Sequence, residues 1–221
     1  MSKHLKNDLE RLERRILSLG AKVEEAVRRS IAALQTRRTD LALEVMAGDP
    51  EIDQVEVEIE EECLKILALH QPVANDLRFT AACLKINNDL ERIGDLAVNI
   101  AERSASLERD LPFSVTRGLQ PMMERTAAML RTALDAFVKG DVQLAMSVRQ
   151  EDNVVDDANR QIIKQMVEHM KTASDQVDDA LLILSASKNL ERIADHATNI
   201  AEDVIYMVEG EIVRHQSSPR V

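Results

Sequence analysis

Apolar residues recur in steps of three and four along two segments of the chain that lie 100 positions apart. This spacing places apolar side chains on one face of an α-helix and polar ones on the other. It predicts two long amphipathic helices, each with one side in the core of a helical bundle. The apolar positions are Cys83, Ile86, Leu90, Ile93, Ala97, Ile100, Ser104 and Leu107 in the first segment, and Ile183, Ala186, Leu190, Ile193, Ala197, Ile200, Val204 and Met207 in the second.

The repetition extends upstream of these segments. "LALEVMAGDPEID" from Leu41 aligns with "LAMSVRQEDNVVD" from Leu144, and "AVRRSIAAL" from Ala26 has the same pattern as "MLRTALDAF" from Met129. Each half of the chain therefore carries three helices. Sequential helices that are joined by short turns pack antiparallel. We predict an all-α protein of two tandem antiparallel three-helix bundles related by internal duplication.

Turn residues mark the expected boundaries. Thr39 or Asp40 is a candidate cap for the second helix, Gly140 followed by Asp141 predicts a helix stop and restart, and Pro72 suits the first turn of the third helix. The longest break in the helical pattern is "SLERDLPFSVTRGLQP", which separates the halves. We expect bundles over 1–110 and 111–214 and a disordered tail over 215–221.

Composition narrows the class of protein. The chain has 221 residues, 2% of them aromatic, so its core must be aliphatic. A net charge of −11 argues against nucleic acid as a partner and is compatible with cations. No apolar run reaches the length of a membrane span, and the N-terminus lacks the apolar centre of a signal peptide, which predicts a cytoplasmic protein without membrane insertion. Cys63 and Cys83 fit buried, reduced thiols.

Candidate chemistry lies in a duplicated motif, "LERIGDLAVNIAE" from Leu90 and "LERIADHATNIAE" from Leu190, with ten of thirteen letters identical. At roughly 100° per residue, its polar residues form a stripe that lies nearly opposite the apolar face. The preceding helix of each half adds two aspartates four residues apart at the edge of its own apolar face. The stripe residues are Glu91, Asp95, Asn99, Glu102, Glu191, Asp195, Asn199 and Glu202; the added aspartates are Asp49, Asp53, Asp152 and Asp156.

Two interpretations of these carboxylates remain open. An acidic helix face is usually only solvated, and Arg92 or Arg192 could partly neutralise it. However, like charges four residues apart destabilise a helix, and here such pairs occur at corresponding places in both halves. Hard cations and iron bind several carboxylate oxygens, so we expect an open metal cluster on the surface. Iron is the first candidate, with Zn, Mn, Mg or Ca as alternatives.

Other motifs argue against catalysis. His196 corresponds to Leu96 in the first half; we interpret it as a surface histidine, with an asymmetric ligand as the alternative. The chain has no inward Glu-x-x-His motif, no phosphate-binding Gly-rich loop and no nucleophile motif. We therefore expect a protein that is not an enzyme.

The two copies of the motif, together with "QPVANDLR" from Gln71 to Arg78, resemble the PhoU family over essentially the whole chain. The resemblance implies two three-helix bundles in a cytoplasmic, often dimeric protein with multinuclear metal clusters on its surface. It assigns the clusters to Asp49, Asp53, Glu91, Asp95, Asp152, Asp156, Glu191 and Asp195, with Asn99, Asn199, Glu102 and Glu202 as secondary candidates. The second half departs from the pattern, because it reads "KTASDQVDD" in place of "QPVANDLR".

The resemblance also implies a function. Members of this family are negative regulators of the phosphate-starvation response that link the ATPase subunit of the phosphate ABC transporter to a sensor histidine kinase. An adaptor of this kind is our leading hypothesis. An iron-binding carboxylate protein for storage or oxidation, and a purely structural bundle with solvated acidic faces, are the alternatives.

Overall fold

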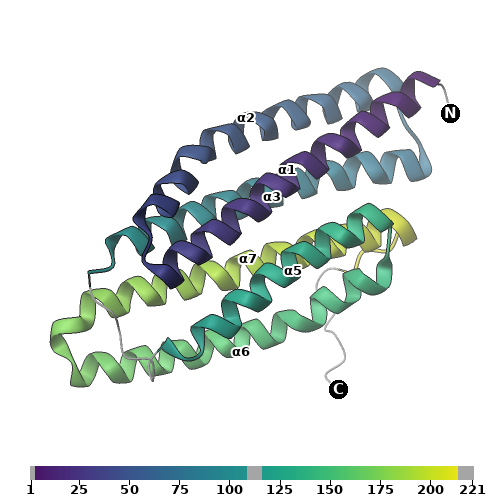
Figure 1. Cartoon of the computed structure of the whole chain (residues 1–221). Helices are drawn as coiled ribbons and strands as arrows, with labels where there is room; N and C mark the ends of the chain where they lie inside the picture. The colour runs from purple at the N-terminus through teal and green to yellow at the C-terminus, as the bar shows by residue number, and fades with distance from the viewer. Residues whose placement is uncertain (1–2, 109–115, 214–221) are drawn as a thin grey trace.

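The computed structural model describes residues 3–108 and 116–213 and consists of six long α-helices with one short 3-10 helix (Figure 1). The first bundle contains α1 (Lys3–Thr36), α2 (Thr39–His70) and α3 (Ala74–Ser106). The second contains α5 (Leu119–Lys139), α6 (Val142–Thr172), the 3-10 helix η1 (Ser174–Gln176) and α7 (Val177–Glu209). The predicted fold class, two all-α bundles of three helices each, is confirmed. The expected domain boundary at residues 110 and 111 and the tail over 215–221 lie outside the described residues.

Each helix buries the aliphatic face that its periodicity predicts. The fully buried side chains include Ile93 and Ile100 on α3 and Leu190 and Ile193 on α7. Both cysteines are free and buried, and burial raises the pKa of the Cys63 thiol to about 12. These thiols belong to the core, as predicted. None of the described helices combines the length and the apolar composition needed to cross a membrane.

The bundles pack against each other through α1 with α5 and α3 with α7, which leaves α2 and α6 on opposite outer sides (Figure 1). Lys85 Nζ on α3 lies 3.1 Å from Asp203 Oδ1 on α7, and Arg103 Nε on α3 donates to Ser185 Oγ on α7 at 3.2 Å. Lys85 and Ser185 are equivalent positions 100 residues apart, and so are Arg103 and Asp203. The duplication therefore builds an internal two-fold relation into an antiparallel contact between α3 and α7.

The turns agree with the sequence in one half and differ in the other. Gly140 ends α5 in the left-handed region at φ 58°, and the Asp141 side chain accepts hydrogen bonds from the first backbone N–H groups of α6, as expected. The predicted cap of α2 is wrong, because the cap position is Arg38 and its guanidinium binds the Asp40 carboxylate instead. The place predicted for Pro72 is also wrong. It lies in the turn before α3, which begins at Ala74.

Candidate metal-binding site

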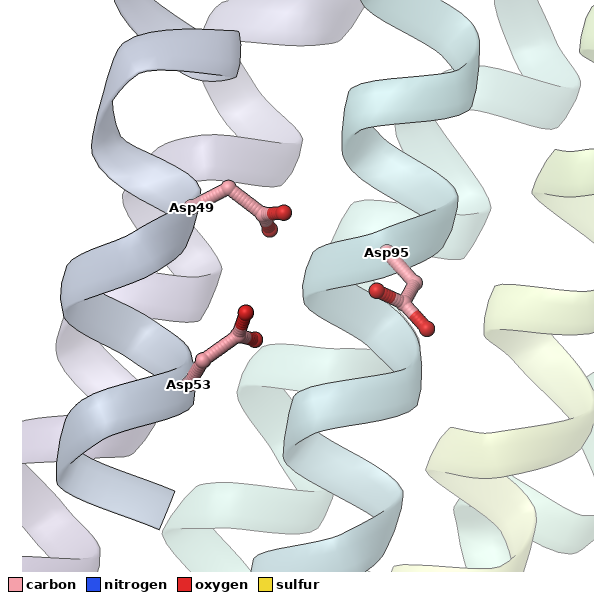
Figure 2. A group of neighbouring side chains, drawn as sticks. All are labelled: Asp49, Asp53 and Asp95. Carbon is pink, nitrogen blue, oxygen red and sulfur yellow. The ribbon is translucent and has the colours of Figure 1, made fainter. Parts of the chain in front are cut away.

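The first acidic cluster lies in the groove between α2 and α3. Asp49 and Asp53 project from neighbouring turns of α2 toward α3, and Asp95 on α3 turns one carboxylate oxygen toward them (Figure 2). One carboxylate oxygen from each residue lies within 4.8 Å of the others. A Cβ atom added at Gly94 would lie 3.3 Å from Ile52 Cγ2 on α2, so the missing side chain allows the helices to approach closely here. The sequence thus brings three carboxylates from two helices to one place.

This spacing fits a cation. Two oxygens bound to one Ca²⁺ lie at most about 5 Å apart, because each Ca–O distance is about 2.3–2.6 Å. Oδ1 of Asp49 is buried, and it has no hydrogen-bond partner in the described part of the chain. A buried polar atom without a partner is costly, and a bound cation would satisfy it. Asp49, Asp53 and Asp95 are therefore the residues that could hold a metal ion in this half.

The carboxylates of the first cluster repel one another, as their short separation implies. Desolvation, followed by the charges of Asp53 and Asp95, raises the pKa of Asp49. Desolvation and then Asp95 raise the pKa of Glu91, and Arg92 opposes this rise. Arg92 reaches both carboxylates, with Nε 3.2 Å from Glu91 and Nη1 3.1 Å from Asp95. The cluster is therefore only partly neutralised by the chain itself.

The second cluster occupies the corresponding groove between α6 and α7. Its four members are Asp152, Asp156, Glu191 and Asp195, the repeat equivalents of Asp49, Asp53, Glu91 and Asp95. Oδ1 of Asp152 is again buried and has no hydrogen-bond partner among the described residues. Unlike the first cluster, these residues do not bring three carboxylate oxygens within 4.8 Å of one another in the part of the chain that the structure describes.

Repulsion is nevertheless stronger in the second cluster. Desolvation, then Glu191, Asp152 and Asp156, raise the pKa of Asp195 to about 6, although the residue as a whole is exposed. Desolvation and the charge of Asp156 raise the pKa of Asp152. The neighbouring Thr198 opposes this second rise, yet its hydroxyl does not meet hydrogen-bond geometry with Asp152. Burial and nearby negative charge therefore favour the protonated form of both Asp152 and Asp195.

The position of the acidic stripe differs from the prediction. Glu91 and Glu191 are not opposite the apolar face but lie on its flank, and their side chains are 20% and 14% exposed. The ideal angle of 100° per residue placed them outward, whereas α2 and α6 cover that flank in the bundle. The candidate sites therefore lie between two helices and not on the open surface of a single helix.

The secondary candidates lie beside the clusters and have other partners. Glu102 is exposed and pairs with Arg103, whereas Glu202 is largely buried and pairs with Arg149 Nε at 3.2 Å. Asn199 donates to Asp89 Oδ1 on α3 at 3.2 Å. Asn99 is partly buried on α3. Neither Glu102 nor Glu202 belongs to the group of Asp49, Asp53 and Asp95.

The contact of His196 was missed from the sequence. The histidine was interpreted as a surface residue, but its ring nitrogen Nδ1 lies 2.7 Å from Asp89 Oδ1 on α3 and its side chain is 19% exposed. It borders a cleft of about 740 Å³ between the bundles, which Asp152 and Asp195 also line. Asp89 corresponds to Asn189 in the second half, so the symmetric pattern of the two halves gives no signal for this contact.

Comparisons with known proteins agree with this architecture. The PhoU domain matches residues 16–104 and 119–204, one match in each bundle. The phosphate-specific transport system accessory protein PhoU homolog of Pseudomonas putida is 37% identical over 100% of this chain and 87% of its own length. The PhoU of Escherichia coli K12 is 32% identical over 97% of this chain and 91% of its own length.

Solved structures give the same result. The crystal structure of PhoU from Pseudomonas aeruginosa has a TM-score of 0.88 at 38% identity and covers 93% of this chain and 99% of its own. The phosphate transport system regulatory protein PhoU from Streptococcus pneumoniae has a TM-score of 0.87 at 31% identity, covering 95% and 99%. Two domain matches, high coverage and a shared fold lead to one conclusion: the chain belongs to the PhoU family.

Proposed function

We propose that the chain is a non-enzymatic cytoplasmic regulator of phosphate uptake and of the phosphate-starvation response. The observation that carries this proposal is the match of both bundles to the PhoU domain, since relatives of nearly the same length are named phosphate-specific transport system accessory proteins. The two halves form separate bundles with outer helices α2 and α6 on opposite sides, which is consistent with a protein that contacts two partners.

In this role the chain is a negative regulator and an adaptor. It connects the ATPase subunit of the phosphate ABC transporter with a sensor histidine kinase, and it acts as a homodimer. A ligand shifts such a system only by binding one state of a partner more tightly than another. Phosphate or metal status would therefore act by changing the affinity of the chain for one of these partners.

The acidic clusters are the proposed metal sites of the adaptor. Asp49, Asp53 and Asp95 would hold an ion in the first groove, and Asp152, Asp156, Glu191 and Asp195 would do so in the second. A multinuclear cluster, with iron as the first candidate, would neutralise carboxylates that otherwise repel one another. The buried oxygens of Asp49 and Asp152 support this assignment, because both lack a partner among the described residues.

Affinity purification from the source cells, grown in high and in low phosphate, tests the adaptor role. We expect an ABC-transporter ATPase or a sensor kinase to be recovered in different amounts under the two conditions. Recovery of neither protein, together with stoichiometric iron, would contradict the regulatory role. Sedimentation velocity of the purified chain tests the homodimer.

Elemental analysis of protein purified without chelators tests the metal sites. The matched variant is Glu91→Ala with Asp95→Ala, which should lower the metal content of the first groove. If the wild type holds no metal and this variant is as stable as the wild type, the acidic faces are only solvated. A cluster made of carboxylates also suits iron storage or oxidation. Oxygen consumption after addition of Fe(II) would support that alternative.

A further inference from the structure

The outward side of α2 carries an apolar stripe that nothing in the described chain covers. Leu43, Pro50, Val57 and Leu64 follow one another at intervals of seven residues. The side chains of Leu43, Val57 and Leu64 are 58%, 48% and 52% exposed, and Pro50 is exposed as well. Seven residues are about two helical turns, so the four positions share one face over about 32 Å. We call this surface the outer α2 face.

The charge around this face is strongly negative. The α2 sequence contains ten carboxylates and a single lysine, Lys65. Some of these carboxylates are paired, for example Glu51 with Lys22 at 2.7 Å. Glu60 borders one edge of the stripe, is exposed, and forms no ion pair with a residue of the described chain. The outer α2 face therefore combines an apolar centre with an uncompensated acidic edge.

The equivalent helix of the second bundle lacks this combination. The positions in α6 that correspond to the stripe are Met146, Asn153, Arg160 and Val167, so polar residues interrupt it. The α6 sequence has five carboxylates and four lysines or arginines. The duplication would have preserved the stripe and its charge in both halves if bundle packing required them, and it has not.

We propose that the outer α2 face docks a basic amphipathic helix of a partner protein. Apolar side chains at intervals of seven residues are anchors for a helix that packs along another helix, and charges beside such a seam select the partner. Lysine or arginine beside the apolar residues of the incoming helix would pair with Glu60. The inference deepens the adaptor role proposed above and rests on it for its physiological meaning.

Two other occupants fit the charge less well. A second copy of the chain, paired through the same face, would bring acidic edges together, which is unfavourable across a helical interface. The cytoplasmic surface of a membrane carries anionic lipids and attracts basic helices, not acidic ones. Each remains a distinct outcome of the test.

The test measures binding of synthetic peptides to the full chain by fluorescence anisotropy. One helical peptide carries leucines at heptad spacing flanked by lysines, and a second peptide has the same leucines flanked by glutamates. We expect the basic peptide to bind at least about tenfold more tightly than the acidic one, since like charges beside a seam oppose pairing. Equal affinity for the basic and the acidic peptide would overturn the proposal that this face selects a basic helix.

The decisive variant is Val57→Gln with Leu64→Gln, which removes two exposed anchors and keeps residues that favour helix. Binding of the basic peptide should weaken at least about tenfold, because apolar anchors carry most of the affinity of such interfaces. The matched control is Met146→Gln with Val167→Gln on α6, which should bind as the wild type does. Equal loss in both variants, or in neither, would show attraction to the net charge alone and would overturn the proposal.

Sedimentation velocity and flotation with vesicles containing anionic lipid complete the experiment. Self-association that the α2 variant abolishes, or vesicle binding that it abolishes, would replace the partner helix with a second copy or a membrane. A failure of peptide binding leaves the recovery of transporter or kinase in phosphate-dependent purification unaffected. The failure of this inference is therefore distinguishable from the failure of the proposed function.

Discussion

The two acidic grooves come from one duplicated sequence but are not equivalent. In the first, oxygens of Asp49, Asp53 and Asp95 lie within 4.8 Å of one another, and the equivalent aspartates of the second groove form no such trio among the described residues. In the first groove Asn87 donates to Glu56 Oε1 at 2.9 Å, whereas in the second Ser187 donates to Asn159 Oδ1 at 3.1 Å. The repeated motif places equivalent carboxylates in both halves, whereas neighbours that are not repeated form different hydrogen bonds beside them.

The contact between α3 and α7 shows the same divergence. The internal two-fold relation places an ion pair between the exposed Lys85 and the buried Asp203 on one side and a neutral acceptor for Arg103 on the other. Lys85 also lies 5.1 Å from the ring centroid of Tyr206. Symmetry of the fold thus tolerates different chemistry at equivalent positions, and variants at matched positions can measure the difference.

The largest expected effect is on metal affinity. Asp49→Asn should weaken binding of Ca²⁺ or Fe²⁺ by at least about 100-fold, because losing even an outer partner of a metal ligand costs about 10–100-fold. Asp152→Asn should leave the tightest binding event unchanged, since its groove holds no close trio. Isothermal titration of chelator-treated protein with the metal ion measures the affinity of both variants, with Glu51→Gln as the control. Equal losses in the two variants would show that the grooves are equivalent.

A smaller effect is expected at the contact between the bundles. Lys85→Met should lower the free energy of unfolding by about 2 kcal/mol, because it removes a charged partner of an almost fully buried Asp203 carboxylate. Arg103→Met should cost less than about 1 kcal/mol, since Arg103 donates to a neutral serine. Urea denaturation measures the free energy of unfolding of both variants. A larger loss of stability in Arg103→Met than in Lys85→Met would contradict this prediction.

The helix caps offer a third matched pair. Asp141→Ala should cost about 1 kcal/mol, because the side chain accepts hydrogen bonds from the Gln143 and Leu144 N–H groups at 2.9 and 3.1 Å. Arg38→Ala, at the equivalent position before α2, should change stability by less than about 0.5 kcal/mol, since it makes no side-chain cap. Thermal melts compare the two, and similar shifts would contradict the difference in capping.

The smallest expected effect is the pH dependence of the second groove. The pKa of Asp195 is about 6 in the folded chain, above its value in the unfolded chain, so the folded state binds more protons between pH 4 and pH 6. Stability of metal-free protein should therefore fall as the pH rises through this window. Because the residue is exposed, we expect less than about 1 kcal/mol. Asp195→Asn should flatten this part of the curve, and an unchanged slope would exclude Asp195 as its source.

Much of this protein could be predicted from the amino-acid order. Steps of three and four fixed the faces of the helices, and the 100-residue repeat predicted two bundles, because local geometry maps sequence spacing directly onto a helix surface. The pairing of Asp141 with a helix start is equally local. The wrong predictions for the cap at Thr39 or Asp40 and for Pro72 both involve turns. At the first turn the Asp40 carboxylate binds Arg38 instead of a backbone N–H group.

The candidate site could be predicted only in part. The sequence identified Asp49, Asp53 and Asp95, but an angle of 100° per residue on an isolated helix could not show that α2 covers the flank of α3. It also could not show that Gly94 allows a close approach to Ile52. These distances depend on how two helices pack, and packing is set by side-chain volumes on both of them.

The sequence by itself therefore determined the helices, their duplication and the carboxylates that each groove contains. The tertiary structure alone decided which carboxylates meet, that His196 reaches Asp89 across the two bundles, and which apolar stripe stays uncovered on α2. The physical reason is the range of the forces involved. Helix formation depends on neighbours a few residues away, whereas charge clusters and exposed surfaces depend on which distant segments come together.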